Sequence, residues 1–555
     1  MNVTYVITTF GKQNLLLNAL QSFRKFHTDD PLIVVDNGGP NADQTEGICK
    51  IYNAKFIRFN ANGSLSKVMN TGMEEAQTPY VCICNNDLEF TTRLTEQFEM
   101  DFEKDPLIKI VGALLMYPDG RIQHGGGRRF WNHQAMGHYG QGKFPYQAKL
   151  CSIPAYRMYV TGAMSAVRKD WWAEHKYDEE MQMGCEDTDL CFRTWKEKGR
   201  VFYDPEITAI HLEGATRGRT DAEKRQQDPA GMAKEKLAYE KFKSLWPDSE
   251  IKKIYDQENK LNADLHPELP RAFVRHMAVG DVLRSTQVYD KLVEKNGPYV
   301  VITHIPEAFQ GKNTIAISEY IDEYAVSSFL DLDLAYERDR TKPIAQSYFG
   351  EAIPDYTETN IEPIVIPFNE SDWTYVRKQE MGFNWNQPYV VMHWGVSWPG
   401  KTMPVDFYKY LAMRLGQKGY GIVTIGSGMD AGATGIDKSG SGIINLVSKT
   451  NLSMLRAICE HAKLFIGPDS GPLHVADGVC PAIGLFTIAR PENLVSAAVT
   501  GIMTKAECAG CIMRQGLTTN YLCEFKDNDP RQYMCVNMFD PEEILKKAFE
   551  LLNVK

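Results

Sequence analysis

Short apolar runs that end in polar residues or glycine alternate with helix-like stretches in the first part of the chain. One run covers residues 3–10, a second ends in Val34-Val35-Asp36-Asn37-Gly38, and a third, residues 81–84, leads into Asn85-Asn86-Asp87. Strands joined by a crossover helix predict an α/β fold with a parallel sheet. The carboxyl ends of such strands meet along one crevice, where open α/β sheets bind ligands. We therefore expect the polar residues after each run to lie at one edge of the sheet.

The triplet Asn85-Asn86-Asp87 is a candidate cation site. Oxygen ligands at the end of a strand suit Mg²⁺ or Mn²⁺, whose remaining positions a diphosphate can fill. Clusters of Asn and Asp also form turns. By itself the triplet leaves both interpretations open.

Several motifs follow one another in the order seen in glycosyltransferase family 2. They are Thr8-Thr9, Val35-Asp36-Asn37-Gly38, Asn62-Gly63 with Asn70-Thr71-Gly72, Asn85-Asn86-Asp87, Gly162-Ala163, Glu186-Asp187-Thr188-Asp189-Leu190 and His211. Residues 1–215 thus resemble the rhamnosyltransferase-like branch of that family, with its GT-A fold. The resemblance implies that Thr8, Asp36 and Asn85 bind the donor, with Asp36 on the nucleotide base. It also implies that Asp87 and His211 hold Mn²⁺ or Mg²⁺. The first Asp of the usual Asp-x-Asp motif is Asn85 here, a departure that this branch often shows.

Glu186-Asp187 carries the candidate catalytic group of this region. An inverting transferase needs a carboxylate that takes a proton from the acceptor hydroxyl as its oxygen attacks the anomeric carbon of the sugar. By resemblance, this base is Asp187. The same residues fit an acidic helix N-terminus, which the helix dipole favours. The two interpretations are compatible, because a helix start would hold the carboxylate in place.

A glycine-rich stretch, Asp119 to Gly127, follows the apolar run 110–116 and contains His124. It predicts either a loop that closes over bound donor or a plain hairpin turn. The residues alone do not decide between the two.

Residues 216–265 are dense in charge and in helix formers, and Pro247, Pro267 and Pro270 interrupt the end of this stretch. They predict a helical connector with a solvated face, because acidic and basic residues are mixed through it. We place a domain boundary near residues 265–270. The expected domains are 1–215, a connector at 216–268, and two Rossmann domains at 269–375 and 376–555.

Apolar runs with glycine at their ends return in the second half. Gly280-Asp281-Val282 precedes a helix-like stretch, and the run 389–395 leads to Lys401. A further run, 464–467, leads to Pro468-Asp469-Ser470-Gly471-Pro472-Leu473-His474-Val475-Ala476. It predicts a buried strand, a tight turn and a helix start whose amides face a diphosphate. Lys401 would add a positive charge to this site.

The run Asp469 to Ala476, with Gly280-Asp281-Val282 before it, resembles the heptosyltransferase-like glycosyltransferase family 9. The resemblance covers residues 270–545 and implies the GT-B arrangement of two facing Rossmann domains. It implies that Asp281 is the catalytic base of a metal-free site. Its donor residues would be Lys401, Asp469, Ser470, Gly471 and His474. The alternative is a degenerate module that only binds or acts as a scaffold.

Four of the twelve cysteines fall near the carboxyl terminus, namely Cys508, Cys511, Cys523 and Cys535. Cys-x-x-Cys followed by two more thiols is a candidate tetrahedral Zn²⁺ site. Disulfides and unliganded thiols are the alternatives. The amino terminus resembles no signal peptide, and the scattered thiols indicate a reducing compartment. We therefore expect a cytoplasmic protein.

The bulk properties fit an enzyme of this kind. At 555 residues the chain has room for about three or four domains. No apolar run approaches the roughly 18 residues of a membrane span. A net charge of −10 gives no general attraction to nucleic acid.

We therefore expect two glycosyltransferase modules that use nucleotide-sugar donors, the first of them metal-dependent. The expected acceptor is a growing glycan such as a surface polysaccharide or lipopolysaccharide core. Addition of sugar to a hydroxymethylated DNA base is the alternative. A carbohydrate-binding scaffold is a third hypothesis, against which Asp87, Asp187 and His211 argue for the first module.

Overall fold

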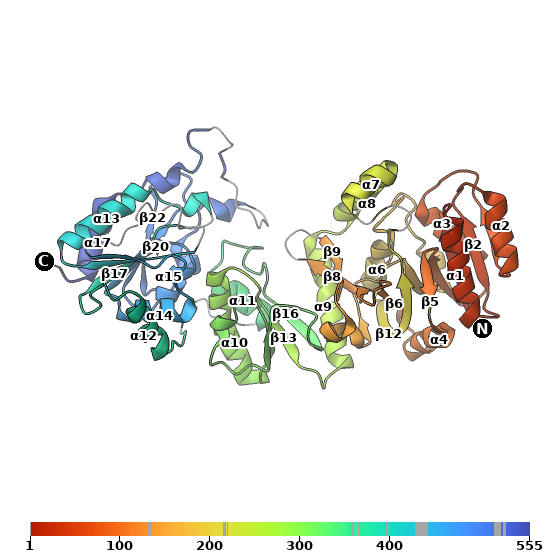
Figure 1. Cartoon of the computed structure of the whole chain (residues 1–555), viewed down its shortest axis with the longest axis horizontal. Coiled ribbons are helices and arrows are strands. Elements are labelled where there is room, and N and C mark those ends of the chain that lie inside the picture. Colours follow the sequence, from red (N-terminus) through yellow and green to blue (C-terminus); the bar gives the residue numbers. More distant parts are fainter. Residues whose placement is uncertain are drawn as a thin grey trace. The chain divides into compact units, whose positions relative to one another are not determined.

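The computed structural model describes most of the chain, namely residues 2–130, 135–214, 218, 220–353, 356, 360–364, 366–395, 398–427, 442–515, 523–525 and 529–554. The chain divides into two units, whose elements are labelled in Figure 1. The first unit is Met1–Pro270 with the short segment Asp322–Ser328. The second unit is Arg271–Ile321 with Phe329–Lys555.

The first unit is built on one large mixed sheet and a separate hairpin. Its strands are β1 (Val3–Thr9), β2 (Leu32–Asp36), β3 (Lys55–Arg58), β4 (Tyr80–Asn85), β5 (Leu88–Phe90), β6 (Ile108–Met116), β7 (Ile122–His124), β8 (Gly127–Phe130), β9 (Ala135–His138), β10 (Ala155–Tyr156), β11 (Met164–Arg168) and β12 (Arg200–His211). Its helices are α1 (Gln13–Phe26), α2 (Ala42–Ile51), α3 (Leu65–Glu75), α4 (Thr95–Lys104), α5 (Lys169–Glu174), α6 (Glu186–Lys196), α7 (Asp221–Gln227), α8 (Pro229–Leu245) and α9 (Asp248–Leu265).

The strand order of this sheet places the predicted site residues at one edge. The order is β10-β12-β6-β11-β4-β1-β2-β3, so the chain winds from β1 out to β3 and then returns to the other side of β1. Strands β2 and β4 are both parallel to β1. Thr9 is level with Asp36, and Thr8 is level with Asn85. The boundary between β1 and β4 is a topological switch point, the place where such sheets bind ligands.

Burial explains why the apolar runs form these elements. All seven residues of β1 are buried, as expected for a parallel strand covered on both faces. In α1 the buried positions follow helical spacing, and they are Leu15, Leu16, Ala19, Leu20 and Phe23.

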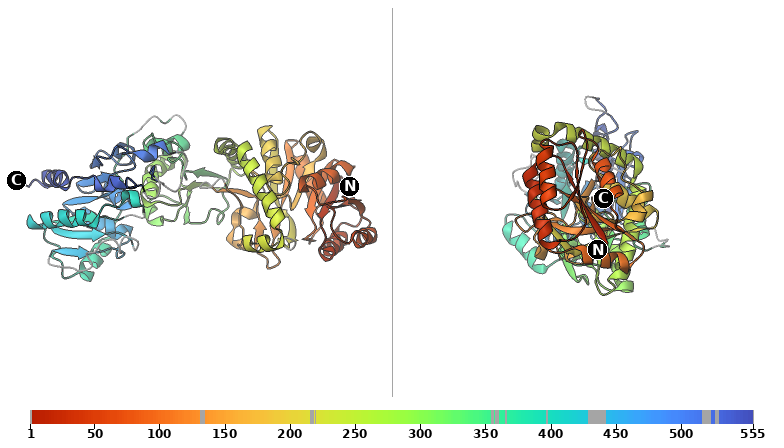
Figure 2. Two further views of the ribbon diagram at one scale, coloured as in Figure 1. Left: turned by 90° about the horizontal axis from the view of Figure 1, so that it is seen from above. Right: turned by 90° about the vertical axis from the view of Figure 1, so that its right-hand side faces the viewer.

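Helices α8 and α9 belong to the first unit. Figure 2 shows these yellow-green helices beside the strands of that unit. Asn262 of α9 donates from Nδ2 to Tyr156 O at 3.0 Å and accepts from Tyr156 N at 2.8 Å on the edge strand β10. Trp246, just before α9, donates to Asp189 of α6 at 2.9 Å. The charged stretch of the sequence thus has a buried face as well as a solvated one.

The second unit contains two sheets. The first sheet consists of β13 (Arg271–Val274), β14 (Val300–Ile302), β15 (Ala316–Ser318) and β16 (Ser328–Asp331), in the order β15-β14-β13-β16. The second sheet consists of β17 (Tyr389–His393), β18 (Gly421–Ile425), β19 (Ile443–Asn445), β20 (Leu464–Pro468), β21 (Ala482–Phe486) and β22 (Val499–Met503). The helices are α10 (Val279–Asn296), α11 (Ile344–Ala352), α12 (Glu370–Gln379), α13 (Val405–Gln417), α14 (Leu452–His461), α15 (Gly471–Ala476), α16 (Pro491–Leu494) and α17 (Pro541–Leu551).

The second of these sheets has the order β19-β18-β17-β20-β21-β22, and all its pairs are parallel. This is the Rossmann order 3-2-1-4-5-6. The smaller sheet repeats the first four positions of that order. Each sheet therefore has its own switch point, between β13 and β16 and between β17 and β20.

Candidate active sites

Asp87 and His211 come together at the edge of the first sheet. Asp87 precedes β5, and β5 pairs with the end of β12 so that His211 is level with Leu88. His211 Nε2 lies 3.1 Å from Asp87 Oδ1, and both side chains are nearly buried. The predicted metal ligands are therefore neighbours, although they are 124 residues apart in the chain.

The chemistry of this pair fits a divalent cation. His211 Nδ1 lies 3.4 Å from Gln123 Oε1, which can only accept a hydrogen bond. A neutral ring that donates from Nδ1 turns its Nε2 lone pair towards Asp87, and a cation between them would satisfy both acceptors. Within the described residues, no group of three or more His, Cys, Asp and Glu side chains is arranged to hold a metal ion. Diphosphate or water oxygens would have to supply the remaining ligands.

Asp187 lies at the start of α6 and is tied to the same edge. Its Oδ2 accepts from Gly162 N at 2.7 Å, and its Oδ1 accepts from Thr188 N at 2.6 Å. The next residue, Ala163, accepts from Asn85 N at 2.9 Å. A Cβ added to Gly162 would lie 3.3 Å from the Asp187 Cβ, so glycine permits this close approach. These contacts connect the predicted base to the end of β4.

Glu186, beside Asp187, is buried, and its carboxyl group is not fully hydrogen-bonded. Its side chain is 5% exposed and its Oε2 has no hydrogen-bond partner. Burial, reinforced by the charge of Asp187, raises the pKa of Glu186 to about 8. Glu186 therefore keeps its proton at neutral pH, whereas the Asp187 oxygens face backbone N–H groups. Of the two carboxyl groups, Asp187 is the better placed to accept a proton.

Asp36 is buried at the end of β2. Its Oδ1 accepts from Gly39 N at 2.9 Å and its Oδ2 accepts from Arg58 Nη1 at 2.8 Å. Burial raises the pKa of Asp36, and the contacts with Gly39 and Arg58 oppose that rise. The Arg58 side chain is 32% exposed, and the sequence motifs gave no sign of it. Nearby, Thr9 accepts from Asn86 Nδ2 at 2.8 Å, which joins β1 to the triplet.

The glycine-rich stretch around His124 contains the predicted hairpin turn. Residues 117–121 connect the antiparallel strands β6 and β7, and Gly120 N donates to Tyr117 O at 2.9 Å. His124 lies on β7, which pairs with β6, and its side chain is fully buried. Its Nδ1 contacts Nδ1 of His138 on β9. Burial lowers the pKa of both histidines. The hairpin alternative is therefore confirmed for residues 117–121. The motif did not predict strand β7 itself, because alternation in a three-residue strand is too short to detect.

In the second unit, Asp281 lies in the first turn of α10. Arg275, which follows β13 and is 4% exposed, contacts Asp281 Oδ2 at 2.8 Å through Nη2 and Asp333 Oδ1 at 3.2 Å through Nη1. His276 Nδ1 lies 2.5 Å from Asp333 Oδ2. Burial tends to raise the pKa of Asp333, but His276 and Arg275 outweigh it and hold that pKa at about 2. The predicted base thus belongs to a charged network at the β13/β16 switch point.

The predicted donor residues meet at the β17/β20 switch point. Lys401 Nζ lies 2.5 Å from Asp469 Oδ2, and His474 Nε2 lies 3.7 Å from Asp469 Oδ1. Burial opposes ionisation of Asp469, but Lys401 and His474 hold its pKa well below the usual range. Ser470 Oγ lies 3.0 Å from His393 Nδ1 and donates to Pro468 O at 3.0 Å. The charge of Lys401 is therefore paired within the protein before any ligand binds.

Two glycines bring the donor loop against the start of α10. A Cβ added to Gly280 would lie 2.3 Å from the His474 ring, and one added to Gly471 would lie 2.8 Å from the Val279 Cβ. Larger residues at these positions would separate α10 from α15. The region of Asp281 and the region of His474 are consequently adjacent.

The four carboxyl-terminal cysteines gather around Cys535, which is 4% exposed. None of the twelve cysteines is joined in a disulfide, which is against the disulfide alternative. Burial, followed by the charges of Cys508, Cys511 and Cys523, raises the pKa of Cys535 to about 12. Across the described residues these thiols form no ready-made metal group. The zinc site stays a prediction.

Two known protein families match separate parts of this chain. The model of glycosyl transferase family 2 matches residues 4–174, and that of glycosyltransferase family 9 (heptosyltransferase) matches residues 342–522. The chain joins a family 2 region to a family 9 region. The predicted fusion and its fold class, a GT-A domain followed by a two-Rossmann GT-B module, are confirmed.

Individual relatives of the two regions cover part of the chain. Lipopolysaccharide heptosyltransferase 3 of Escherichia coli is 32% identical over 138 residues, which are 24% of this chain and 38% of the relative. The family 9 glycosyltransferase of Veillonella parvula covers 52% of this chain and 98% of its own, with 18% identity and a TM-score of 0.39. GalNAc-T7, solved with UDP, GalNAc and Mn²⁺, covers 48% of this chain and 52% of its own, with 16% identity and a TM-score of 0.35.

The matches cover only part of each curated relative and leave several predicted site residues outside the matched ranges. The chain spans 25% and 38% of the lengths of the two curated relatives that it matches. Asp187 and His211 lie beyond the matched part of the family 2 region, and Asp281 precedes the matched part of the family 9 region. Their roles stay predictions. No helix in the described parts of the chain is long and apolar enough to cross a membrane.

Proposed function

We propose that the chain is a glycosyltransferase with two active sites, one in each unit, which both use nucleotide-sugar donors. The observation that carries this proposal is the link between the base and the metal edge of the first unit. Asp187 accepts from Gly162 N, while the adjacent Ala163 accepts from Asn85 N. A proton acceptor and a cation site at one switch point suit metal-dependent transfer from a sugar diphosphate.

In the first unit, Asp187 takes the proton of the acceptor hydroxyl. The acceptor oxygen attacks the anomeric carbon from the side opposite the diphosphate, so the new bond forms as the old one breaks and the configuration inverts. The nucleoside diphosphate leaves with the electron pair of the broken bond. Thr8, Asp36 and Asn85 bind the nucleotide part of the donor. A divalent cation held by Asp87 and His211 would neutralise the leaving diphosphate.

In the second unit, Asp281 takes the corresponding role as general base. Arg275 fixes the position of its carboxylate through the 2.8 Å contact. The donor binds at Asp469, Ser470, Gly471 and His474. Its diphosphate faces the backbone amides that follow Asp469 and the charge of Lys401, which act in place of a cation. The close approach of α10 and α15 places the proposed base on one helix beside the proposed donor residues on the other.

The acceptor is a growing glycan, with lipopolysaccharide core or a surface polysaccharide as the leading class. The name of the Escherichia coli relative, a lipopolysaccharide heptosyltransferase, supports this choice. The net charge of −10 is unfavourable for a DNA acceptor. DNA that contains hydroxymethylated bases therefore enters only as one arm of the acceptor test.

We also propose that Cys508, Cys511, Cys523 and Cys535 hold one structural Zn²⁺. Four thiolates in tetrahedral geometry suit Zn²⁺ and also suit iron. Elemental analysis of the purified chain should find one equivalent of zinc that is lost in the Cys508→Ser variant. If iron is found instead of zinc, the metal is wrong but the cysteine site stands. If the wild-type protein contains no metal, the proposed site is wrong.

The function is tested with the full chain and a panel of nucleotide sugars, each offered with glycan and DNA acceptors. Asp187→Asn should lower transfer by the first unit by about 10²- to 10⁴-fold, because a general base contributes that much to the rate. Asp281→Ala should do the same for the second unit only. The matched controls are Asp170→Asn and Asp290→Asn, which change exposed carboxylates of α5 and α10.

Each outcome assigns the units. If Asp281→Ala changes no transferred sugar while Asp187→Asn stops all transfer, the second unit is a binding module. If neither variant affects transfer, the proposed bases are wrong. Absence of transfer from every donor by the wild-type chain would contradict the enzymatic function itself.

A further inference from the structure

Helix α10 carries a second charged residue on the same face as Asp281. Arg284 lies three residues after Asp281, and residues at this spacing are neighbours on a helix surface. The Arg284 side chain is only 1% exposed. Arginine is rarely buried to this degree unless its donors are all used.

The guanidinium of Arg284 reaches three different groups. Its Nη1 donates to Glu362 O at 2.8 Å, and its Nη2 pairs with Asp477 Oδ2. Asp477, fully buried, also accepts from Ser496 N at 2.9 Å. The third nitrogen, Nε, lies 3.2 Å from His474 Nδ1. One arginine on the helix of the predicted base therefore contacts the helix that ends the donor loop.

The contact with His474 defines which ring nitrogen carries the proton. Arginine has donors and no acceptor, so His474 Nδ1 must accept the hydrogen bond from Arg284. The ring then carries its proton on Nε2. Nε2 lies on the side of Asp469, whose Oδ1 is 3.7 Å away. A hydrogen-bond donor is thereby directed towards the loop where the donor diphosphate is expected.

Burial of this pair is costly, which argues for a role beyond stability. Burial lowers the pKa of Arg284, and Asp477 opposes that change. A buried ion pair often contributes less to stability than apolar side chains of the same volume would. The ion pair fixes the orientation of the guanidinium. That orientation determines which ring nitrogen of His474 carries the proton.

We infer that Arg284 is a positioning residue of the second unit, which holds His474 with its proton on Nε2 and directs that N–H at the donor diphosphate. The inference rests on the proposed function of this unit. It deepens that function, because the helix that presents Asp281 to the acceptor also orients a donor-binding residue. Acceptor-side and donor-side geometry would then be set by residues of one helix face.

The first test measures the His474 ring directly and needs no activity. In the full chain labelled with ¹⁵N-histidine, the His474 signals are identified by their loss in His474→Gln. We expect Nδ1 to be unprotonated and Nε2 protonated. Arg284→Lys keeps a cation for Asp477 but lacks the Nε–H group, and it should give a mixture of the two tautomers. The Arg284→Met, Asp477→Asn double variant, which leaves no buried charge unpaired, should do the same.

The second test separates positioning from a structural role. Arg284→Lys should weaken binding of the donor nucleotide by about tenfold, the usual scale for one charge-assisted hydrogen bond. In a His474→Ala background, Arg284→Lys should weaken nucleotide binding almost no further. The reason is that the two changes remove the same interaction, namely the one that His474 makes with the nucleotide. Lys291→Met, an exposed change on α10, is the matched control.

The outcomes distinguish this inference from the proposed function. An unchanged Nε2–H pattern in both Arg284 variants would overturn the positioning role. Additive losses in the His474→Ala background would also overturn it. If the wild-type second unit binds no nucleotide while the tautomer still depends on Arg284, the proposed function fails and the orienting contact stands.

Discussion

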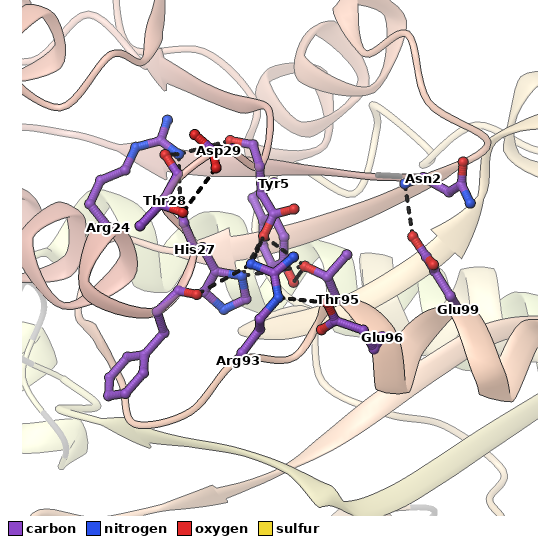
Figure 3. Close-up of polar contacts among 12 residues, drawn as sticks. Asn2, Tyr5, Arg24, His27, Thr28, Asp29, Arg93, Thr95, Glu96 and Glu99 are labelled. Carbon is purple, nitrogen blue, oxygen red and sulfur yellow. Dashed lines mark hydrogen bonds and ion pairs between the residues drawn. The ribbon is translucent and has the colours of Figure 1, made fainter.

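A buried carboxylate, Asp30, connects three elements of the first unit at a distance from the candidate site. Its Oδ2 lies 2.8 Å from His27 Nδ1, accepts from Thr95 Oγ1 at 2.8 Å and lies 3.1 Å from Arg93 Nη1. Figure 3 shows His27, Thr95 and Arg93 close together beside Tyr5 of β1. Burial tends to raise the pKa of Asp30, but the hydrogen bonds from His27 and Thr95 and the charge of Arg93 outweigh it and lower that pKa.

This lowered pKa predicts the acid sensitivity of the first unit. A carboxyl group whose pKa is lower in the folded state contributes stability above its unfolded pKa of about 3.9, and the contribution is lost as the pH falls through the folded value. Asp30→Asn should therefore lower the melting temperature of the first unit at pH 7 and flatten its decline below about pH 4. Calorimetry of the full chain from pH 7 to pH 3 checks this. The exposed Asp43→Asn should leave the profile unchanged, and a wild-type profile for Asp30→Asn would contradict the assignment.

Both predicted bases follow a residue with an unusual backbone. Cys185, immediately before Glu186 and Asp187, has φ 66°, and Ala278, three residues before Asp281, has φ 67°. Side chains other than glycine rarely adopt positive φ, and such strain costs about 1–3 kcal/mol. Strained residues persist where the surrounding structure requires them, and here each precedes the helix that presents a carboxylate.

Replacement of Ala278 with glycine should relieve this strain. We expect the melting temperature of the second unit to rise by a few degrees, on the order of 1 kcal/mol, while transfer by that unit falls because Asp281 is held less firmly. Ala412→Gly, in the middle of α13 with ordinary backbone angles, should instead destabilise by about 1 kcal/mol. Calorimetry and transfer assays measure both effects. Destabilisation by Ala278→Gly would show that the conformation carries no strain.

At the scale of elements, the same arrangement occurs in each sheet. The strand order reverses between β1 and β4, between β13 and β16, and between β17 and β20. The predicted site residues stand at these three places, with Asn85, Asp281 and Asp469 as examples. Helices on either side of a switch point diverge, which leaves the strand ends open to a ligand.

Helix α9 replaces a missing strand at the edge of the first sheet. Asn262 offers its side-chain amide to both backbone groups of Tyr156, as a neighbouring strand would. Glu258, one turn earlier, accepts from Met158 N at 3.1 Å. Edge strands need such cover, because their unpaired backbone groups otherwise bind other chains.

Asn262→Leu should therefore destabilise the first unit by about 2–4 kcal/mol, because two backbone groups of Tyr156 lose their partners. The exposed Lys260→Ala on the same helix should change stability by less than about 0.5 kcal/mol. Melting of the full chain compares the two, and aggregation of Asn262→Leu would report the uncovered edge. Equal stability of both variants would show that α9 does not support β10.

At the scale of the whole molecule, the proposed function has the two units meeting diphosphate charge in different ways. The first unit offers Asp87 and His211, which suit a cation, whereas the second offers Lys401 beside Asp469. Excess chelator should therefore abolish transfer by the first unit and leave transfer by the second unaffected, with Mn²⁺ restoring the first. Full transfer by the first unit in chelator would contradict its metal dependence.

A control separates this effect from loss of the cysteine site. Cys508→Ser should change the response of the first unit to Mn²⁺ by no more than experimental scatter, because the four cysteines lie in the second unit. If Cys508→Ser and chelator give the same loss, the chelator acts through the cysteines and not through Asp87.

The amino-acid sequence by itself determined the α/β class, the two families and the strand ends that carry the site residues. Buried parallel strands read as continuous apolar runs, and glycine and polar residues must follow them where the chain turns towards ligand. Local patterns of this kind can be recognised in the amino-acid sequence alone. Together with the family resemblances, they are the reason that the sequence alone predicts Asp36, Asn85 and Asp469 as site residues.

Only the tertiary structure decided which side chains meet across long stretches of chain. Arg58, Arg275 and Arg284 lie in no recognisable motif, yet each contacts a predicted site residue, as does Gln123 on its short strand. The pairing of Arg284 with His474 spans 190 residues, and periodicity within a helix carries no information about a partner that far away. Spacing along the chain predicts which face of a helix or strand a residue occupies. Tertiary packing determines which side chains that face contacts.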